Sequence, residues 1–414
     1  MLVRSYPPLL RHRRYHLLPF RIQRVQHSGT MQPENSAIMI IAGEASGDLH
    51  GAHLVRAMRD LDPGLQFYGV GGDRMEAAGV QLIARSSQMA VMGAVEVLPR
   101  LGFILQVRRG LKKSLKQSGP SLLILIDYPG FNLPLARFAH ENGIKVFYYI
   151  SPKVWAWRKK RIYALEQYVD RMALILPFEE AIYKAVKLDA RFVGNPLLDT
   201  VKRSLDRGEA LRKFGLREGV TTVALLPGSR KGEVTRLLPP MLQMAAMLKK
   251  RIPAVQFVLP LAETLPHGLV EGLVKSQEGE VAITRENGYD AVGLADVAVV
   301  ASGTATLETA LLGVPMVIVY RLSALSYWIG RAVVQVDHIG LVNLIAGRGI
   351  VPELIQGEAT PERMADEAYH ILTDRSRTEE IQKGLAEVRD LLGETGASQR
   401  AAQMAYEMIK VPRG

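Results

Sequence analysis

The chain has 414 residues, 48% of them hydrophobic and 22% charged, which is an ordinary globular composition and long enough for two domains. Cysteine is absent, which excludes disulfides, thiolate catalysis, iron–sulfur clusters and cysteine-ligated zinc. The net charge of +11 is unevenly spread, because six arginines precede the first acidic residue, Glu34, and the remainder holds 46 basic and 41 acidic residues. This mildly basic remainder argues against a nucleic-acid partner.

Residues 1–35 form a basic extension that we leave out of the fold prediction. The segment is rich in arginine and poor in acids, and its apolar stretch at residues 17–20 is too short for a secretory signal. Three interpretations stay open: translation from Met31 with the upstream residues not native, a disordered tail, or an organelle transit peptide. No run of about 18 uncharged apolar residues occurs, so we expect a soluble chain without a transmembrane helix.

From residue 37 onward, short apolar runs alternate with helical patterns. The first series predicts strands at 37–42, 66–70, 121–127, 145–150, 172–176 and 190–193, with a first helix at 50–59. After a break at 193–196 and a charged stretch through 219, a second series predicts strands at 221–226, 255–259, 281–284, 297–301 and 316–320, then helix from 361 to 411. Continuous apolar strands separated by helices indicate parallel sheets covered on both faces.

We therefore predict an α/β fold of two Rossmann-like, doubly wound domains that face a cleft. Their bounds are 36–198 and 199–414, and the terminal helices pack back on the first domain. Ligands of such sheets bind outside the carboxyl ends of the strands, so the loops after the strands are expected to hold the chemistry.

Two loops of the first domain carry acids directly after a strand. In the loop at residues 43–48, small residues let a ligand approach the backbone, and Glu44, Ser46 and Asp48 favour a sugar or acceptor contact. The alternative is a tight turn in which Ser46 or Asp48 caps the next helix. Asp127 ends an apolar strand, where partial desolvation raises a carboxylate's pKa and suits a general base. The alternative for Asp127 is a turn cap or a surface ion pair.

Two loops of the second domain favour anions. Gly228 and Ser229 can expose backbone N–H groups, and Arg230 supplies a planar fork for a diphosphate, although the spacing is not that of a Walker A loop. The alternative for this loop is an exposed basic turn. A second strand–turn–helix starts with Ser302, Gly303 and Thr304, and the helix start attracts phosphate. Glu308, one turn later, can accept hydrogen bonds from two ribose hydroxyls, or it can simply complement the helix dipole.

Residues 91–116 combine apolar side chains with a basic end, a pattern typical of an interfacial membrane contact. An amphipathic core helix with a solvated end is the alternative. The candidate contacts are Met92, Val95, Leu98, Leu101, Phe103, Ile104, Arg108, Arg109 and Lys112.

Eight motifs, in order along the chain, resemble the lipid-A-disaccharide synthases. They are AGEASGDLHGA (42–52), YGVGGDRMEAAG (68–79), VMGAVEVL (91–98), IDYPGFN (126–132), YYISPKVWAW (148–157), FVGNPLLD (192–199), LPGSRKGEV (226–234) and ASGTATLE (301–308). Asn343 also falls where that family has a functional asparagine. The resemblance covers nearly the whole chain after Met31, and the N-terminal extension is its one departure.

The resemblance implies a GT-B glycosyltransferase that joins UDP-2,3-diacylglucosamine to 2,3-diacylglucosamine 1-phosphate (lipid X). The products are a β-1,6-linked disaccharide 1-phosphate and UDP, in lipid A biosynthesis. Such enzymes are cytosolic and associate peripherally with the inner membrane, because both substrates are acylated. The sequence does not indicate an oligomeric state.

The implied roles follow from an inverting displacement. Asp127 is the first candidate for the base and Glu44 the second. Arg230, the Gly228–Ser229 backbone and the Ser302–Thr304 helix start stabilise the leaving diphosphate. Glu308 holds the ribose and Asn343 contacts the donor; no metal ion or other cofactor is predicted. Rival interpretations are a UDP-GlcNAc 2-epimerase or muramyl-pathway transferase, and a non-catalytic nucleotide-sugar or lipid-binding protein.

Overall fold

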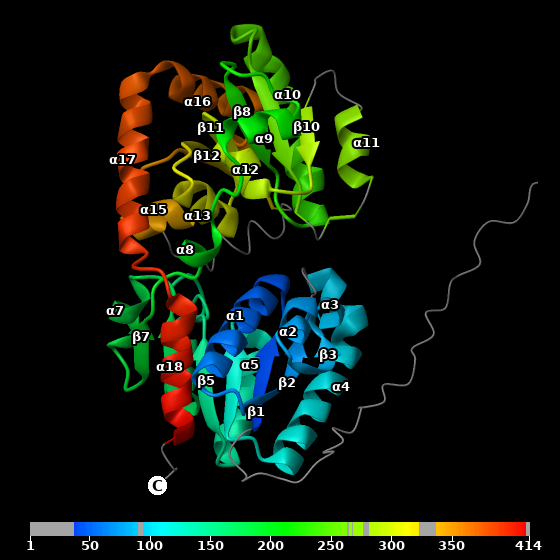
Figure 1. Ribbon diagram of the computed structural model, residues 1–414, viewed down its shortest axis with the longest axis vertical. Helices are drawn as coiled ribbons and strands as arrows, with labels where there is room; N and C mark the ends of the chain where they lie inside the picture. The colour runs from blue at the N-terminus through cyan, green and yellow to red at the C-terminus, as the bar shows by residue number, and fades with distance from the viewer. Residues whose placement is uncertain are drawn as a thin grey trace, which may run out of the picture.

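The computed structural model describes residues 37–89, 94–262, 265–266, 268–275, 281–322 and 337–410, with the side chains of 94–101 and 275 excepted. The basic extension and Met92 lie outside these ranges. Two parallel sheets are stacked one above the other in Figure 1, each flanked by helices. The two domains expected from the alternating pattern are therefore present.

The first sheet has seven parallel strands in the order β3-β2-β1-β4-β5-β6-β7. The strands are β1 (Ala37–Ala42), β2 (Gln66–Gly71), β3 (Gln81–Arg85), β4 (Leu122–Ile126), β5 (Lys145–Tyr149), β6 (Arg171–Leu174) and β7 (Asp189–Phe192). The helices between them are α1 (Ala45–Leu61), α2 (Asp73–Ala77), α3 (Ser86–Met89), α4 (Ala94–Ser118), α5 (Pro129–Glu141), α6 (Arg161–Tyr168) and α7 (Glu179–Tyr183).

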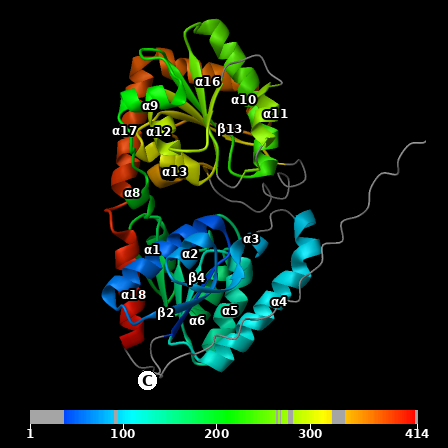
Figure 2. The ribbon, with the colours of Figure 1, turned by 45° about the vertical axis from the view of Figure 1, so that its right-hand side comes forward.

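Both faces of this sheet are buried, which explains its continuous apolar strands. On β1, Ile38 and Ile40 pack into a cluster with α1 and α18 (Ala397–Lys410), whereas Met39 and Ile41 pack on the other face with α4 and α5. Figures 1 and 2 show these helices on opposite sides of the sheet. Successive side chains of a strand alternate between faces, so a strand covered on both sides must be apolar at every position.

The second sheet has six parallel strands in the order β10-β9-β8-β11-β12-β13. They are β8 (Thr222–Leu226), β9 (Gln256–Pro260), β10 (Val281–Thr284), β11 (Val297–Ala301), β12 (Met316–Tyr320) and β13 (Glu353–Ile355). Its helices are α8 (Leu197–Thr200), α9 (Arg207–Phe214), α10 (Lys231–Arg251), α11 (Leu269–Lys275), α12 (Gly288–Gly293), α13 (Thr304–Leu311), α15 (Leu341–Ala346), the 3-10 turn η1 (Gln356–Glu358), α16 (Pro361–Thr373) and α17 (Arg375–Leu391).

The sequence pattern missed the two strands β3 and β13. Strand β3 pairs only with β2 at the sheet edge, and four of its five residues are not buried, so it lacks a long apolar run. Strand β13 has three residues, which is too short to show a period. The predicted strands match observed strands to within about two residues at each end, which is the usual uncertainty of element boundaries.

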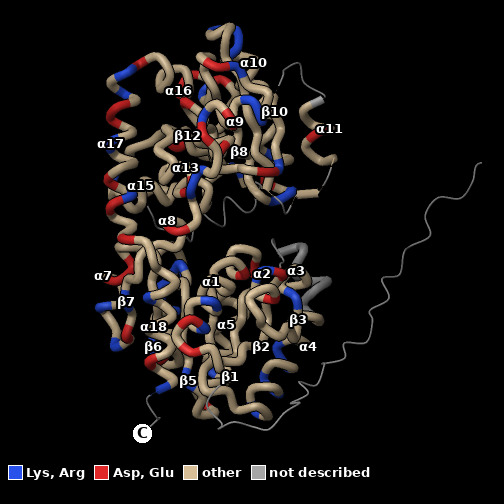
Figure 3. Tube along the Cα trace, viewed as in Figure 1, with Lys and Arg blue, Asp and Glu red and all other residues tan. Residues whose placement is uncertain are grey.

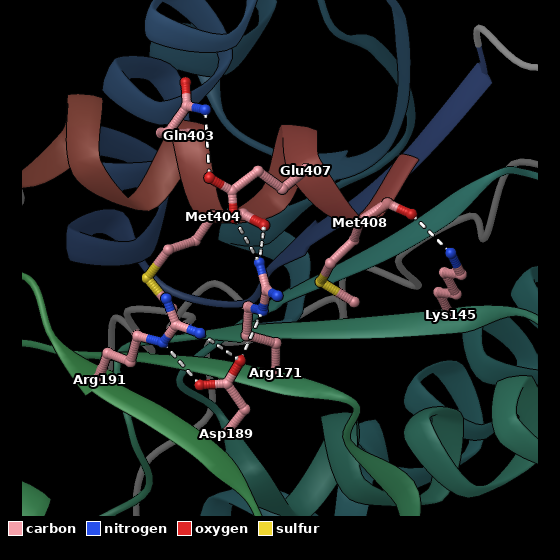
Figure 4. A network of polar contacts seen from close by, with 8 residues as sticks. All are labelled: Lys145, Arg171, Asp189, Arg191, Gln403, Met404, Glu407 and Met408. Carbon is pink, nitrogen blue, oxygen red and sulfur yellow. Dashed lines mark hydrogen bonds and ion pairs between the residues drawn. The ribbon is translucent and has the colours of Figure 1, made fainter. Parts of the chain in front are cut away.

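Helix α18 crosses from the second domain and packs against α1, β5 and β6 of the first, whereas α16 and α17 stay with the second sheet. Figure 4 shows the polar network along its edge. Arg171 on β6 pairs with Asp189 on β7 and with Glu407 on α18, both at 2.9 Å. Lys145 donates to the Met408 carbonyl at 2.7 Å. These bonds attach the end of the chain to the first sheet.

The two interdomain crossings of the chain are hydrogen-bonded to each other. The Asn195 amide donates to the Leu392 carbonyl at 2.9 Å, and the Gly396 amide to the Asp199 carboxylate at 2.8 Å. Arg400 on α18 donates to the Val193 carbonyl at 2.8 Å. The crossings at 193–199 and 392–396 therefore run as a connected pair.

Candidate active site

The four loops singled out in the sequence follow the four central strands of the two sheets. In the first sheet the strand order reverses between β1 and β4, and in the second between β8 and β11. Loops diverge at such switch points and leave room for a ligand beyond the strand ends. The topology thus places the loops after β1, β4, β8 and β11 at the two positions where a doubly wound sheet binds ligands.

The turn after β4 has a constrained backbone. Asp127 and Tyr128 have φ angles of +42° and +47°, a left-handed conformation that costs free energy outside glycine. Two buried donors hold the turn through the Asp127 carbonyl: Asn132 Nδ2 at 2.7 Å and Tyr148 Oη at 2.5 Å. Pro129 then starts α5. Hydrogen bonds from neighbouring side chains therefore hold this left-handed turn in place, and the turn sets the direction of the Asp127 side chain.

The environment of Asp127 suits a proton acceptor. Burial and, second, the negative charge of Glu44 raise the pKa of Asp127 to about 6, while the positive charge of Lys153 acts in the opposite direction. A carboxylate with this pKa is ionised at neutral pH and still takes up a proton more readily than an exposed aspartate. This environment is compatible with a general base, and the assignment of Asp127 to that role stays a prediction.

The loop after β1 packs directly on this turn. A Cβ added at Gly43 would lie 2.3 Å from Tyr128 Cδ1, so only glycine fits under the ring. Glu44 is partly exposed at the start of α1, and Ser46 is exposed. The two acidic loops predicted from the sequence are thus in contact.

Asp48 has a different environment from Glu44. Its buried carboxylate accepts backbone N–H groups of Gly72 at 2.6 Å, Arg74 at 3.1 Å and Met75 at 3.0 Å. These bonds cap the start of α2 rather than α1. The contacts of Asp48 are those of an anchor between two loops, and an acceptor contact through its side chain stays a prediction.

The loop after β8 folds around Glu233 on α10. Gly228 has a φ of +109°, and an added Cβ would lie 2.5 Å from Glu233 Oε2. The Glu233 carboxylate accepts the Ser229 amide at 3.2 Å and the Arg230 guanidinium at 2.8 Å. The donors predicted to hold a diphosphate therefore converge on one carboxylate of this loop, which shows that they can meet at a single anionic group.

Arg230 also reaches the first domain. Its Nη2 lies 4.0 Å from Glu44 Oε2, and both side chains are partly exposed. Because Glu44 follows β1 and Arg230 follows β8, this contact shows that the carboxyl ends of the two sheets face each other. The acids of the first domain and the cation of the second are therefore neighbours.

The loop after β11 opens α13. Ser302 Oγ donates to the Ile339 carbonyl at 3.2 Å, and Thr304 is exposed at the first helical position. A Cβ added at Gly303 would meet nothing within 4 Å, so the space over the helix start is open. The first amides of a helix have no partner within it, which suits this start to a phosphate.

Glu308 lies one turn into α13 and is partly buried. Its Oε1 accepts Tyr289 Oη at 3.1 Å, and burial raises the pKa of Glu308 while that bond lowers it. Tyr289 on α12 therefore orients a carboxylate next to the anion site. Two ribose hydroxyls could still be accepted there, because a carboxylate has about four acceptor positions.

Asn343 is buried, and its amide group is fully bonded within the protein. It donates to the Val351 carbonyl at 2.9 Å and to Glu353 Oε1 at 2.7 Å, and its oxygen accepts the Ile350 and Val351 amides. Glu353 in turn accepts the amides of residues 339 and 340, beside Ser302. This arrangement favours a positioning role over the direct donor contact expected from the resemblance.

Sequence reasoning missed the residues that hold the site in place. Asn132, Tyr148, Glu233 and Tyr289 each orient a predicted functional group, and all but Tyr289 lie within the eight motifs quoted above. Their presence in those motifs was the available signal. Within the described ranges, no three His, Asp or Glu side chains gather into a group that could hold a metal ion.

Residues 91–116, which the sequence predicts to contact a membrane, are only partly described. Met92 lies outside the described residues, and Val95, Leu98 and Leu101 fall in the first turns of α4, where only the backbone is described. Phe103 and Ile104 pack against the core of the first domain. Lys112 lies over the Phe138 ring at 4.8 Å, and Arg109 is exposed. The described half of α4 is thus an amphipathic helix against the sheet.

Comparison with known proteins places this site in a family. A family model described as lipid-A-disaccharide synthetase matches residues 38–408. The lipid-A-disaccharide synthase of Syntrophus aciditrophicus is 57% identical over 374 residues, which cover 90% of this chain and 98% of that protein. The enzyme of Geobacter sulfurreducens is 48% identical over 372 residues, 90% of this chain and 97% of that protein.

Solved structures share the fold at low sequence identity. A UDP-GlcNAc 2-epimerase from Neisseria meningitidis has a TM-score of 0.63 at 10% identity, covering 90% of this chain and all of that one. MurG from Acinetobacter baumannii has a TM-score of 0.55 at 14% identity, covering 90% and 99%. The calicheamicin glycosyltransferase CalG4 has a TM-score of 0.62 at 12% identity, covering 92% and 100%. The architecture is therefore GT-B, and with the sequence relatives it shows that this chain belongs to the lipid-A-disaccharide synthase family of glycosyltransferases.

Proposed function

We propose that the chain transfers 2,3-diacylglucosamine from its UDP ester to the 6-hydroxyl of 2,3-diacylglucosamine 1-phosphate. The family supports this pair of substrates, and one observation carries the assignment of roles. The Glu44 carboxylate at the end of the first sheet faces Arg230 at the end of the second, with 4.0 Å between them. A transferase of this kind needs a base and a diphosphate site on opposite sides of the anomeric carbon.

The acceptor oxygen attacks the anomeric carbon in line with the departing diphosphate. The new C–O bond forms as the bond from the anomeric carbon to the diphosphate oxygen breaks, and the configuration inverts. Asp127 accepts the hydroxyl proton, and burial together with the charge of Glu44 keeps the pKa of Asp127 high enough for this. UDP leaves with the electron pair.

The second domain stabilises the charge that develops on the leaving group. Arg230, the Ser229 amide and the start of α13 at Ser302–Thr304 supply fixed donors for the diphosphate oxygens. Glu308 accepts the ribose hydroxyls, and Tyr289 holds Glu308 in place. On binding, the diphosphate replaces Glu233 as the partner of Arg230, so the loop after β8 exchanges an internal anion for an external one.

The acylated substrates require access to a lipid surface. We propose that residues 91–116, which include most of α4, make that contact at the inner face of the cytoplasmic membrane. Figure 3 shows Lys and Arg along α4, and its described side chains include five cations and no acid: Arg108, Arg109, Lys112, Lys113 and Lys116. A cationic helix is attracted to anionic lipids. None of the helices that the structure describes is long and apolar enough to span a membrane.

An assay with purified protein and both lipid substrates in detergent micelles tests the function. We expect UDP and the tetraacyl disaccharide 1-phosphate in equal amounts, and neither product when the acceptor is omitted. Release or epimerisation of the UDP-sugar without acceptor would instead favour an epimerase. Binding of UDP without turnover would leave a nucleotide-sugar-binding protein.

A further inference from the structure

The loop between β5 and α6 carries a concentration of positive charge that the reaction described so far does not use. From Lys153 to Arg161, five of nine residues are basic and none is acidic. None of the five forms an ion pair with any described residue: Lys153, Arg158, Lys159, Lys160 and Arg161. Like charges held close together repel one another, so an anion bound at this loop would be stabilised by them.

The inner side of this loop is fixed to the domain. Trp155 Nε1 donates to the buried carboxylate of Glu179 at 3.1 Å, and the Trp155 ring meets Phe178 edge-on with centroids 5.2 Å apart. Ser151 Oγ and Tyr183 Oη are hydrogen-bonded at 2.7 Å. The backbone of the loop is therefore held from below, and its outer side chains are presented from a rigid base.

The outer side presents an aromatic ring with two guanidinium groups close to it. Trp157 is 39% exposed, and the guanidinium carbons of Arg158 and Arg161 both lie 4.8 Å from its ring centroid. Arg158 has a φ of +55°, a conformation uncommon outside glycine. Burial and, second, the charge of Arg158 lower the pKa of Arg161. Two like charges thus converge on one ring.

This loop starts beside the candidate base. Strands β4 and β5 are parallel neighbours, and the Asp127 amide donates to the Tyr149 carbonyl at 3.1 Å. Lys153 is close enough for its charge to act on Asp127. The cations therefore lie on the acceptor side of the reaction, in the first domain, and are separate from the diphosphate site around Arg230.

We propose that Lys153, Arg158 and Arg161, with the Trp157 ring, bind the phosphate monoester of the acceptor. The inference rests on the proposed function, in which the acceptor carries a 1-phosphate one sugar ring away from the attacking 6-hydroxyl. Planar guanidinium forks match phosphate oxygens, and the ring supplies an apolar plate for the sugar. The site directs the 6-hydroxyl towards Asp127, and it distinguishes the acceptor from the donor sugar, which has no phosphate monoester.

The test compares two acceptors and two pairs of substitutions in mixed detergent micelles. The variant is Arg158→Gln with Arg161→Gln, and the control is Lys249→Gln with Lys250→Gln, which removes the same charge from exposed positions on α10. We expect the variant to raise the KM for the phosphorylated acceptor by about tenfold or more and to leave the KM for the UDP-sugar within about twofold. The control is expected to change neither.

A second acceptor, 2,3-diacylglucosamine without phosphate, completes the test. The wild-type chain is expected to use it poorly, and the variant equally poorly, whereas Arg158→Lys with Arg161→Lys should partly restore discrimination. An unchanged KM for the phosphorylated acceptor would overturn the proposal. An equal loss of activity with both acceptors would also overturn it. If the variant lost only its binding to phosphatidylglycerol vesicles, the loop would bind a lipid headgroup and the proposal would again be wrong. If the wild-type chain forms no disaccharide, the proposed function fails first and this inference with it.

Discussion

Arg230 of the second domain lies 4.0 Å from Glu44 of the first, measured from Nη2 to Oε2. The same guanidinium bonds Glu233 at 2.8 Å, so one cation contacts a carboxylate on each side of the facing sheets. In the proposed mechanism, a diphosphate takes the place of Glu233 as the partner of Arg230. The two contacts hold the guanidinium between the two domains, where the proposed donor site lies.

Replacing this cation tests the donor site. Arg230→Ala removes charge-assisted hydrogen bonds worth about 1.5–3 kcal/mol, so the Kd for UDP should rise by about 10- to 150-fold. Isothermal titration of UDP measures it. Arg236→Ala removes an exposed arginine from α10, the helix that follows Arg230, and should leave the Kd unchanged. Equal affinities for Arg230→Ala and wild type would place the diphosphate elsewhere.

Replacing the base tests the acceptor side. Asp127→Asn keeps the size of the side chain but cannot accept a proton, so kcat should fall by about 100-fold or more. The Kd for UDP should stay as in wild type, because Asp127 belongs to the other domain. If Asp127→Asn turns over at a near-normal rate and Glu44→Gln does not, the base is Glu44.

The pH dependence of kcat/KM gives a separate test. The base must be ionised in the free enzyme, so activity should rise with pH through about 6, the pKa of Asp127, and level off above it. Glu44→Gln removes a negative neighbour, which lowers this pKa and moves the acid limb to lower pH. Lys153→Gln removes a positive neighbour and moves it to higher pH. Shifts in the same direction for both variants would contradict the assignment.

The contact between Gly43 and Tyr128 should be intolerant of a methyl group. In Gly43→Ala the new Cβ would lie 2.3 Å from Tyr128 Cδ1, so the Tyr128 ring must move. We therefore expect a loss of about 1–3 kcal/mol in the free energy of unfolding, with a fall in kcat. Denaturant titration and steady-state kinetics measure the two effects. Gly130→Ala is the control, since a Cβ there meets nothing within 4 Å. Equal stability of the two variants would show that the ring moves freely.

Replacing Asn343 tests whether this residue positions the neighbouring loop or contacts the donor directly. Asn343→Ala leaves the Ile350 and Val351 amides and Glu353 short of partners, so the free energy of unfolding should fall by about 2–4 kcal/mol, together with UDP affinity. Asn142→Ala, which loses one exposed bond to Phe138, should cost less than about 1 kcal/mol. Lost affinity at unchanged stability would instead indicate direct contact with the donor.

The two parallel sheets could be predicted from sequence because their central strands are apolar at almost every position. The four motif loops could be predicted for the same reason, since each begins where such a strand ends. Strand β3 could not, because most of its side chains are not buried and nothing in its pattern shows the pairing with β2.

The roles of several polar residues depend on contacts between distant segments, which a linear pattern does not contain. Asp48 bonds residues 24 to 27 positions away, and Tyr289 reaches Glu308 from a different helix. The sequence marked Asp48 as polar and near a strand end, but only the fold shows that its carboxylate is already bonded. Trp155 and Trp157 lie two residues apart in one motif, and only the fold separates the hydrogen-bonded Trp155 from the exposed Trp157.

The paired crossings at 193–199 and 392–396 connect the two domains along one line. Two connections that are hydrogen-bonded to each other are expected to permit rotation about the line through them and to resist twisting across it. Gly194, Gly393 and Gly396 have positive φ angles at this line, where backbone rotation is least hindered. We expect rotation about this line to change the separation of Glu44 and Arg230, and so to widen or narrow the space between the two sheets for the proposed acylated substrates.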